Sequence, residues 1–169
     1  NDSTGSLDIN DLQNAKKSDD YHKPKTKMLA LENTHNVAGG KVINLTELEL
    51  VTSQARRLSL SLHLDGARLF NASIYLGVKP KKIASYFDSV TFCLSKGLCC
   101  PIGSIIVGSR EFIQECRRWR KILGSGMRQV GVIAAPGILA LDTMIDRLAE
   151  DHLNARFLAE GLSNIKGVL

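Results

Sequence analysis

The sequence predicts an α/β domain with three layers and a mostly parallel sheet. Runs of strand length alternate along the chain with longer segments of helical periodicity, an order typical of βαβ units. The connections between these runs are long enough to hold a crossover helix, which parallel strands require. A chain of 169 residues, 44% hydrophobic and 23% charged, can bury a sizeable core within one domain.

The predicted domain begins after a polar segment. Residues 1–25 are rich in Asn, Asp, Ser and Lys and lack sustained apolar periodicity, so we expect a loop or mobile extension there. Residues 26–169 form the domain, and residues 26–32 are its first strand-like run. A polar turn with glycines near its exit follows at residues 33–40.

A helix and a strand are expected next. Thr46 and Glu49 have the spacing of a capping box, and apolar residues recur at helical spacing over the following turns. Leucines then alternate strictly with other residues over residues 58–65. This alternation predicts a strand that ends on the carboxylate of Asp65.

The alternation of helices and strands continues through the middle of the chain. A helix over residues 67–75 and a short helix over residues 80–84 precede an alternating run at residues 88–96. We interpret this run as a buried strand, and residues 104–107 as a further strand after a turn.

Two helical segments complete the predicted fold. Ser109 can cap a helix whose apolar residues, Cys116 among them, line one face toward the core, and Gly124 ends this helix. A longer helical region over residues 130–162 is expected to bend or break near Pro136.

Composition argues against several classes of protein. No apolar run approaches the length of a membrane span and no signal-peptide layout is present, so we expect a cytoplasmic chain without membrane contact. The four cysteines lack metal-binding spacing, which argues against a metal site and for reduced thiols. The net charge of +5 includes a basic run at residues 117–121. Nucleic-acid binding by this run is an alternative that we disfavour, because exposed aromatic residues do not interleave it.

Three polar residues each follow a predicted strand: His35, Asp65 and Lys96. Ligands of parallel sheets bind beyond the carboxyl ends of the strands, so we expect these side chains to converge on one rim. The aspartate and the lysine could form a structural ion pair. They could also hold pyridoxal phosphate, whose aldehyde bonds to a lysine amine and whose ring nitrogen pairs with a carboxylate. Apolar surroundings at the end of a buried strand would make the Lys96 amine nucleophilic.

Four motifs occur in a fixed order: LENTHN at residues 31–36, HLDGARLFNA at 63–72, LSKGL at 94–98 and GMRQ at 126–129. Together they resemble the low-specificity L-threonine aldolases, which are fold-type-I pyridoxal-phosphate enzymes of the beta-eliminating lyase family. The resemblance extends from about Met28 to the C-terminus and implies the large domain of that fold.

The resemblance implies a role for each matching residue that would contact the cofactor. Lys96 would carry pyridoxal 5'-phosphate, and Asp65 would pair with its ring nitrogen. Arg128 would help to bind the phosphate, in the site of a neighbouring subunit. His63 lies on the same side of its strand as Asp65 but further from the rim, and we interpret it as structural.

Other matching residues would contact the substrate. Arg68 would receive its carboxylate, a task that suits the planar guanidinium. Lys121 would lie at the edge of the same pocket. His35 would lie near the substrate hydroxyl or the cofactor, and it is a candidate base because its ordinary pKa lies near neutrality; a water molecule is the alternative.

The implied activity is retro-aldol cleavage of L-threonine, L-allo-threonine or another 3-hydroxy amino acid to glycine and an aldehyde. A lyase of amino-acid metabolism that forms a tetramer built from dimers is the expectation. Two alternatives are another pyridoxal-phosphate lyase and an inactive remnant that acts through protein contacts. The family pattern places a phosphate-binding loop upstream and a small domain downstream, so we expect residues 26–169 to be a central part of the large domain with little turnover alone.

Overall fold

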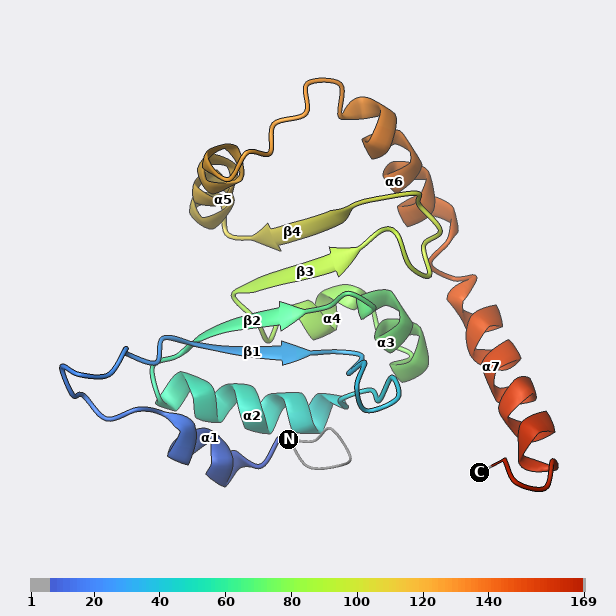
Figure 1. The fold of residues 1–169 in the computed structure, drawn as a ribbon, viewed down its shortest axis with the longest axis horizontal. Helices are drawn as coiled ribbons and strands as arrows, with labels where there is room; N and C mark the ends of the chain where they lie inside the picture. Colours follow the sequence, from blue (N-terminus) through green and yellow to red (C-terminus); the bar gives the residue numbers. More distant parts are fainter. Residues whose placement is uncertain (1–6, 169) are drawn as a thin grey trace.

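The computed structural model describes residues 7–168, which contain a four-stranded sheet of order β1-β2-β3-β4 (Figure 1). The strands β1 (Met28–Glu32), β2 (Ser61–Asp65) and β3 (Ser89–Cys93) are parallel. The fourth strand, β4 (Ser104–Gly108), pairs antiparallel with β3. The predicted α/β class with a mostly parallel sheet is therefore confirmed.

One face of the sheet is covered by the crossover helices α2 (Leu45–Arg57), α3 (Leu69–Leu76) and α4 (Pro80–Ala84). Both crossovers advance in the same direction across the sheet, and right-handed connections then place their helices on the same face. The core between these layers contains large side chains that are fully buried: Leu48, Leu62, Leu64 and Ile83. The opposite face of β1 and β2 carries Met28 and otherwise small or polar side chains, and we call it the open face.

Helix α2 begins two residues earlier than its sequence pattern predicts. Asn44 is the cap, and its side-chain oxygen accepts a hydrogen bond from the backbone N–H of Glu47 at 2.9 Å. The predicted capping box at Thr46 and Glu49 is therefore wrong, because Thr46 already lies within the helix. The helix ends at Arg57, so the strand predicted over residues 58–65 is shortened to its last five residues.

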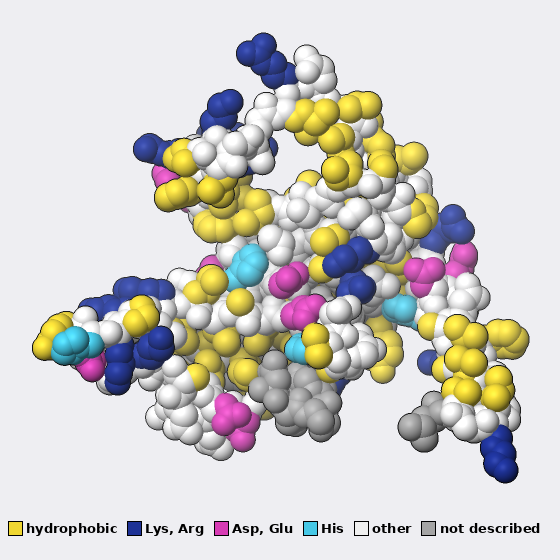
Figure 2. All heavy atoms as spheres, viewed as in Figure 1, with side chains coloured by type: hydrophobic (Ala, Val, Ile, Leu, Met, Phe, Trp, Pro, Cys, Tyr) yellow, Lys and Arg dark blue, Asp and Glu magenta, His cyan; other side chains and the backbone are white. Residues whose placement is uncertain are grey.

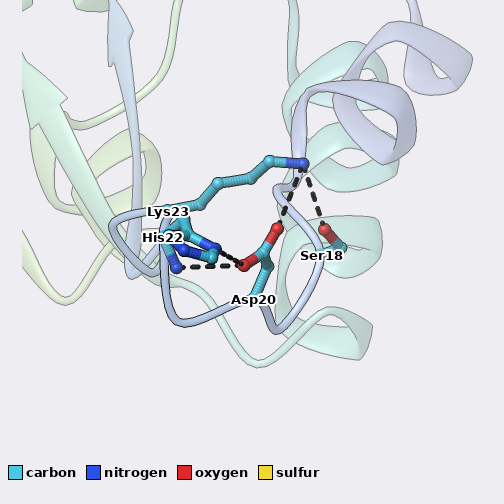
Figure 3. A network of polar contacts seen from close by, with 4 residues as sticks. All are labelled: Ser18, Asp20, His22 and Lys23. Atoms are coloured by element: carbon cyan, nitrogen blue, oxygen red, sulfur yellow. Dashed lines mark hydrogen bonds and ion pairs between the residues drawn. The ribbon is translucent and has the colours of Figure 1, made fainter.

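The N-terminal segment, expected to be a loop, contains helix α1 (Ile9–Ala15). Asp8 caps this helix, and Leu12 is buried in the core, which explains why the segment is held against the domain. The connection after α1 is organised around the Asp20 carboxylate, which accepts hydrogen bonds from the backbone and ring of His22 and pairs with Lys23 (Figure 3). The expectation of an unstructured extension is thus wrong for this part of the chain.

The C-terminal half consists of β4 and three helices, α5 (Arg110–Ile122), α6 (Gly131–Thr143) and α7 (Leu148–Ser163). Helix α6 continues through Pro136, and the chain changes direction between Thr143 and Leu148 instead. The break predicted near Pro136 is therefore displaced by about two turns. Pro136 lies beyond the first turn of α6, so it removes one intrahelical hydrogen bond without ending the helix.

The apolar face of α5 is not covered within the described chain. None of the α5 side chains is buried, and Trp119 is 57% exposed. Cys116, predicted to face the core, is only half-buried. Figure 2 shows hydrophobic side chains at the surface over α5, α6 and α7. The sequence predicted that the apolar side chains of α5 face the core. They are exposed instead, because the described chain has no further layer that covers them.

A buried asparagine closes the segment between β1 and α2. The side chain of Asn33 is fully buried and donates to the backbone oxygen of Ile43 at 3.1 Å. It also accepts from the backbone N–H of Ile43 at 3.2 Å. One side chain thus joins the two ends of a ten-residue segment. None of the helices within residues 7–168 has the length and apolar character that a membrane span needs.

We expect Asn33→Ala to lower the free energy of unfolding by about 2–4 kcal/mol, because both backbone groups of Ile43 would lose their buried partner. Urea denaturation measures this loss. The matched control is Asn44→Ala, which removes one exposed cap and costs about 1 kcal/mol. Equal losses for the two variants would contradict the structural role given to Asn33.

Candidate active site

The carboxyl ends of the three parallel strands lie side by side. Glu32 of β1 pairs in register with Asp65 of β2, and Asp65 pairs in register with Thr91 of β3. Residues in register on neighbouring strands share one face of a sheet. Because Leu62 and Leu64 point into the core, this row belongs to the open face. Two carboxylates and a hydroxyl therefore lie next to one another at the rim.

The second row on the open face has a structural hydrogen bond. His63 Nδ1 lies 2.8 Å from the hydroxyl of Ser89 on the neighbouring strand, and Ser89 is buried. This contact connects the two strands that precede Asp65 and Lys96. The structural role predicted for His63 is compatible with it.

Asp65 is exposed, and its Oδ1 accepts a hydrogen bond from the backbone N–H of Ala67 at 3.1 Å. The next residue, Gly66, donates its backbone N–H to Thr91 O at 2.8 Å. A Cβ atom at Gly66 would lie 2.8 Å from that oxygen, so only glycine fits. This close approach fixes the direction in which the Asp65 carboxylate leaves the strand.

Lys96 lies three residues beyond the end of β3, in an exposed bend. The strand was predicted to continue to Lys96 with apolar surroundings, but it stops at Cys93 and the lysine side chain is exposed. The apolar surroundings predicted for Lys96 are found at Leu94 instead, which is buried. The bend therefore presents the Lys96 amine to solvent near the end of the strand that neighbours β2.

The bend is held in place by α7. A Cβ atom at Gly97 would lie 2.6 Å from Cδ2 of Leu148 and 3.4 Å from Oδ1 of Asn71. Leu148 is itself fully buried. Helices α3 and α7 thus pack directly against the residue that follows Lys96, and this contact restricts where the lysine can lie.

Arg68 precedes the first turn of α3 and is half-buried. It lines a cavity of about 610 Å³ between the loop after β1, helix α3 and helix α7. Arg68 takes part in none of the ion pairs found within residues 7–168. A half-buried guanidinium that faces a cavity in this way is suited to bind an anion.

His35 lies in the loop after β1, and its Nδ1 accepts a hydrogen bond from the backbone N–H of Ala38 at 3.2 Å. A neutral imidazole that accepts at Nδ1 carries its proton at Nε2. In this arrangement Nε2 is a hydrogen-bond donor. His35 lines a second cavity, with Glu32 and Glu47, on the outer side of β1 rather than the cavity of Arg68.

Lys121 and Arg128 do not lie with the other candidate residues. Because β4 runs antiparallel, α5 begins at the amino-terminal ends of the parallel strands, opposite to the rim of Asp65 (Figure 1). Lys121 lies in the last turn of α5, and Arg128 lies in the connection to α6. Both are exposed, and neither lines the cavity of Arg68 or that of His35.

Charged and histidine side chains lie near the carboxyl ends of the strands. Figure 2 shows acidic, basic and histidine side chains over the ends of the strands, and further basic side chains at the left of the view and over α5. Asn71 and His152, which sequence reasoning missed, come close to this region from α3 and α7. They are separated by 81 positions in the chain, so no local pattern could have connected them.

Comparison with known proteins gives this arrangement a family. The sequence profile described as Beta-eliminating lyase matches residues 1–169. The chain belongs to this family. It is 45% identical over 168 residues to a probable low-specificity L-threonine aldolase 2 of Arabidopsis thaliana, covering 98% of the chain and 47% of that protein. It is 48% identical over 158 residues to the low specificity L-threonine aldolase of Escherichia coli, covering 94% and 46%.

Solved structures agree with this assignment to the beta-eliminating lyases. A putative L-allo-threonine aldolase of Listeria monocytogenes superposes with a TM-score of 0.83 at 26% identity, covering 95% of the chain and 43% of that structure. A threonine aldolase of Leishmania major, at 23% identity and a TM-score of 0.80, shares the fold and covers 95% and 48%. The chain spans about half the length of the relatives that it matches.

We expect Gly97→Ala to destabilise this beta-eliminating lyase domain by about 1–3 kcal/mol, because the new methyl group overlaps the side chain of Leu148. The variant Leu148→Ala removes the overlapping atoms. In that background the Gly97→Ala penalty should vanish, as a double-mutant cycle followed by urea denaturation would measure. Additive losses would contradict a direct contact between the bend and α7.

Proposed function

We propose that this chain is part of a pyridoxal-phosphate-dependent lyase that cleaves L-threonine and related 3-hydroxy amino acids to glycine and an aldehyde. The observation that carries the proposal is the position of Asp65 and Lys96 at the ends of adjacent parallel strands. Membership of the beta-eliminating lyases and the 45–48% identity to named threonine aldolases support it.

The residues at the rim fit the chemistry of pyridoxal phosphate. An exposed primary amine at Lys96 is accessible to an aldehyde, and the Asp65 carboxylate can hold a proton at the ring nitrogen. When bound, the cofactor would supply the electron sink that accepts the bonding electrons as the Cα–Cβ bond of the substrate breaks. Lys96 would hold the cofactor covalently, and Asp65 would orient its ring.

The remaining residues would act on the substrate. The Arg68 guanidinium would bind the carboxylate with two parallel hydrogen bonds, which fixes the orientation of the Cα–Cβ bond. His35 lines the cavity on the outer side of β1, so its side chain would have to turn toward the cavity of Arg68 to contact the substrate hydroxyl through Nε2. While Nδ1 accepts from Ala38, Nε2 carries a proton, so His35 would polarise the hydroxyl as a donor. Water would then receive the hydroxyl proton unless the Ala38 hydrogen bond breaks.

Lys121 and Arg128 fit this reaction through a second copy of the chain. Within one copy neither residue lines the cavity of Arg68 or that of His35, which makes a contribution to the same site unfavourable. In a homo-oligomer, exposed cations of this kind could bind the cofactor phosphate or the substrate of a neighbour. The uncovered apolar faces of α5 and α6 are compatible with such an assembly.

The attachment role of Lys96 predicts a spectroscopic result. Purified protein mixed with pyridoxal phosphate should develop a visible absorption band of covalently bound cofactor, which borohydride removes. Lys96→Ala should lose this band. The matched control is Lys82→Ala, an exposed lysine on α4 that packs over Tyr86 and should leave the band unchanged. A full band in Lys96→Ala would reject the proposed attachment.

The role of His35 predicts an effect on rate rather than on cofactor attachment. We expect His35→Asn to lower kcat for threonine cleavage in the full-length enzyme about 10²-fold or more, in line with the loss of a hydrogen-bond donor to the reacting oxygen. The absorption band should persist, because His35 is not needed to hold the cofactor. Glycine or acetaldehyde formation measures the rate, and an unchanged kcat would remove His35 from the mechanism.

A further inference from the structure

The connection between α1 and β1 concentrates positive charge, and we call its residues 16–27 the basic connection. It holds five lysines against two aspartates, which leaves three of the chain's net charge of +5 in this short segment. All five lysines are exposed. The basic connection lies at the left of Figure 1, where Figure 2 shows basic, histidine and hydrophobic side chains gathered together.

The two aspartates of the basic connection each lie near a lysine. Lys25 Nζ lies 3.1 Å from Asp19 Oδ1, and Lys23 Nζ lies 3.8 Å from Asp20 Oδ2. These two pairs compensate the negative charge of the segment. The excess of positive charge therefore belongs to the other lysines.

The other lysines line one cavity. It has a volume of about 610 Å³ and lies between the end of α1, the basic connection and residues 58–59. Lys16 Nζ donates to the backbone oxygen of Leu58 at 2.9 Å, so this lysine binds the end of α2. Lys17 and Lys27 also line the cavity, and they take part in none of the ion pairs found within residues 7–168. Two ammonium groups are thus available to an anion there.

The basic connection also presents an aromatic ring to solvent. Tyr21 is 92% exposed, and its ring contacts the ring of His22 at 3.7 Å between centroids. Asp20 holds His22 in place, because its Oδ1 accepts from the backbone N–H of His22 at 2.9 Å and lies 3.2 Å from Nδ1 (Figure 3). The Tyr21 ring therefore has a supported position and an open surface.

We propose that the basic connection binds single-stranded nucleic acid, with a base stacked on Tyr21 and phosphate groups at Lys17 and Lys27. Proteins that bind single strands without sequence preference combine a positively charged groove with aromatic rings on which bases stack. Both components occur here within one segment. A duplex offers the same phosphates but keeps its bases stacked on one another, so the ring favours a single strand.

This surface is separate from the candidate active site. The basic connection precedes the amino end of β1, whereas Asp65 and Lys96 follow the carboxyl ends of β2 and β3 (Figure 1). A bound strand would lie away from the cofactor. Nucleic-acid binding is therefore an activity in addition to the proposed lyase reaction.

Fluorescence anisotropy of a labelled single strand of about twelve thymidines, mixed with the full-length protein, tests the role of the ring. We expect Tyr21→Ala to weaken binding about tenfold, in line with the loss of one stacked base. Tyr21→Phe keeps the ring and should bind as the unaltered protein does. The matched control is Tyr75→Ala, which removes another exposed tyrosine and should also bind normally. Unchanged affinity in Tyr21→Ala would overturn the proposal.

The salt dependence of binding measures the phosphate contacts. For single strands the logarithm of the association constant falls with the logarithm of salt concentration, with a slope of about −0.7 for each phosphate contacted. The double variant Lys17→Gln/Lys27→Gln should make this slope shallower by about 1.4, whereas Tyr21→Ala should leave it unchanged.

The matched control for charge is Arg117→Gln/Arg118→Gln, which removes two exposed cations from α5. It should keep both the affinity and the slope. A loss of affinity in this control without a loss in Lys17→Gln/Lys27→Gln would overturn the proposal.

Other ligands separate this proposal from its alternatives. Duplex DNA of the same length should bind more weakly than the single strand, and equal affinity would overturn the role of stacking. Vesicles of phosphatidylcholine with phosphatidylserine test an anionic membrane instead, and binding to vesicles without binding to the single strand would overturn the proposal. Lys96→Ala should lose the cofactor band and keep its affinity for the single strand. Nucleic-acid binding can therefore fail while the proposed enzyme function holds, and the reverse.

Discussion

The level alignment of three strand ends is the constraint on which the candidate site depends. Backbone hydrogen bonds continue past the strands themselves: Asn33 N donates to Asp65 O at 3.1 Å, and Gly66 N donates to Thr91 O at 2.8 Å. These two bonds hold three chain segments at one height as they leave the sheet. The side chains that follow then have little freedom to lie anywhere but at a common rim.

Much of this arrangement could be predicted from the sequence because it depends on local periodicity. Strict alternation of leucines marked β2 and placed Asp65 at its end, and the parallel order followed from the crossover lengths. The errors came where two signals competed. Thr46 and Asn44 both have side chains that can cap a helix, and it is Asn44 that makes the cap hydrogen bond. Helix α1 is short and polar, so its single buried leucine gave no period to detect.

The parts that could not be predicted depend on contacts between distant segments. The direction of β4 is set by its pairing with β3, and this direction places the start of α5 at the end of the sheet opposite to Asp65. The meeting of Asn71 with His152 depends on how α7 returns to the bend after β3. The amine of Lys96 is exposed because β3 ends at Cys93. The alternation of apolar residues continues to Leu94, so the sequence pattern predicted a longer strand.

The exposed position of Trp119 has a practical consequence, because it is the single tryptophan of the chain. Its emission spectrum reports the polarity around one face of α5 without contribution from any other indole. Contact with another chain at that face would shift the emission toward shorter wavelengths, whereas events confined to the opposite edge of the sheet would leave the wavelength unchanged. Fluorescence can therefore follow the covering of this surface separately from ligand binding at the strand ends.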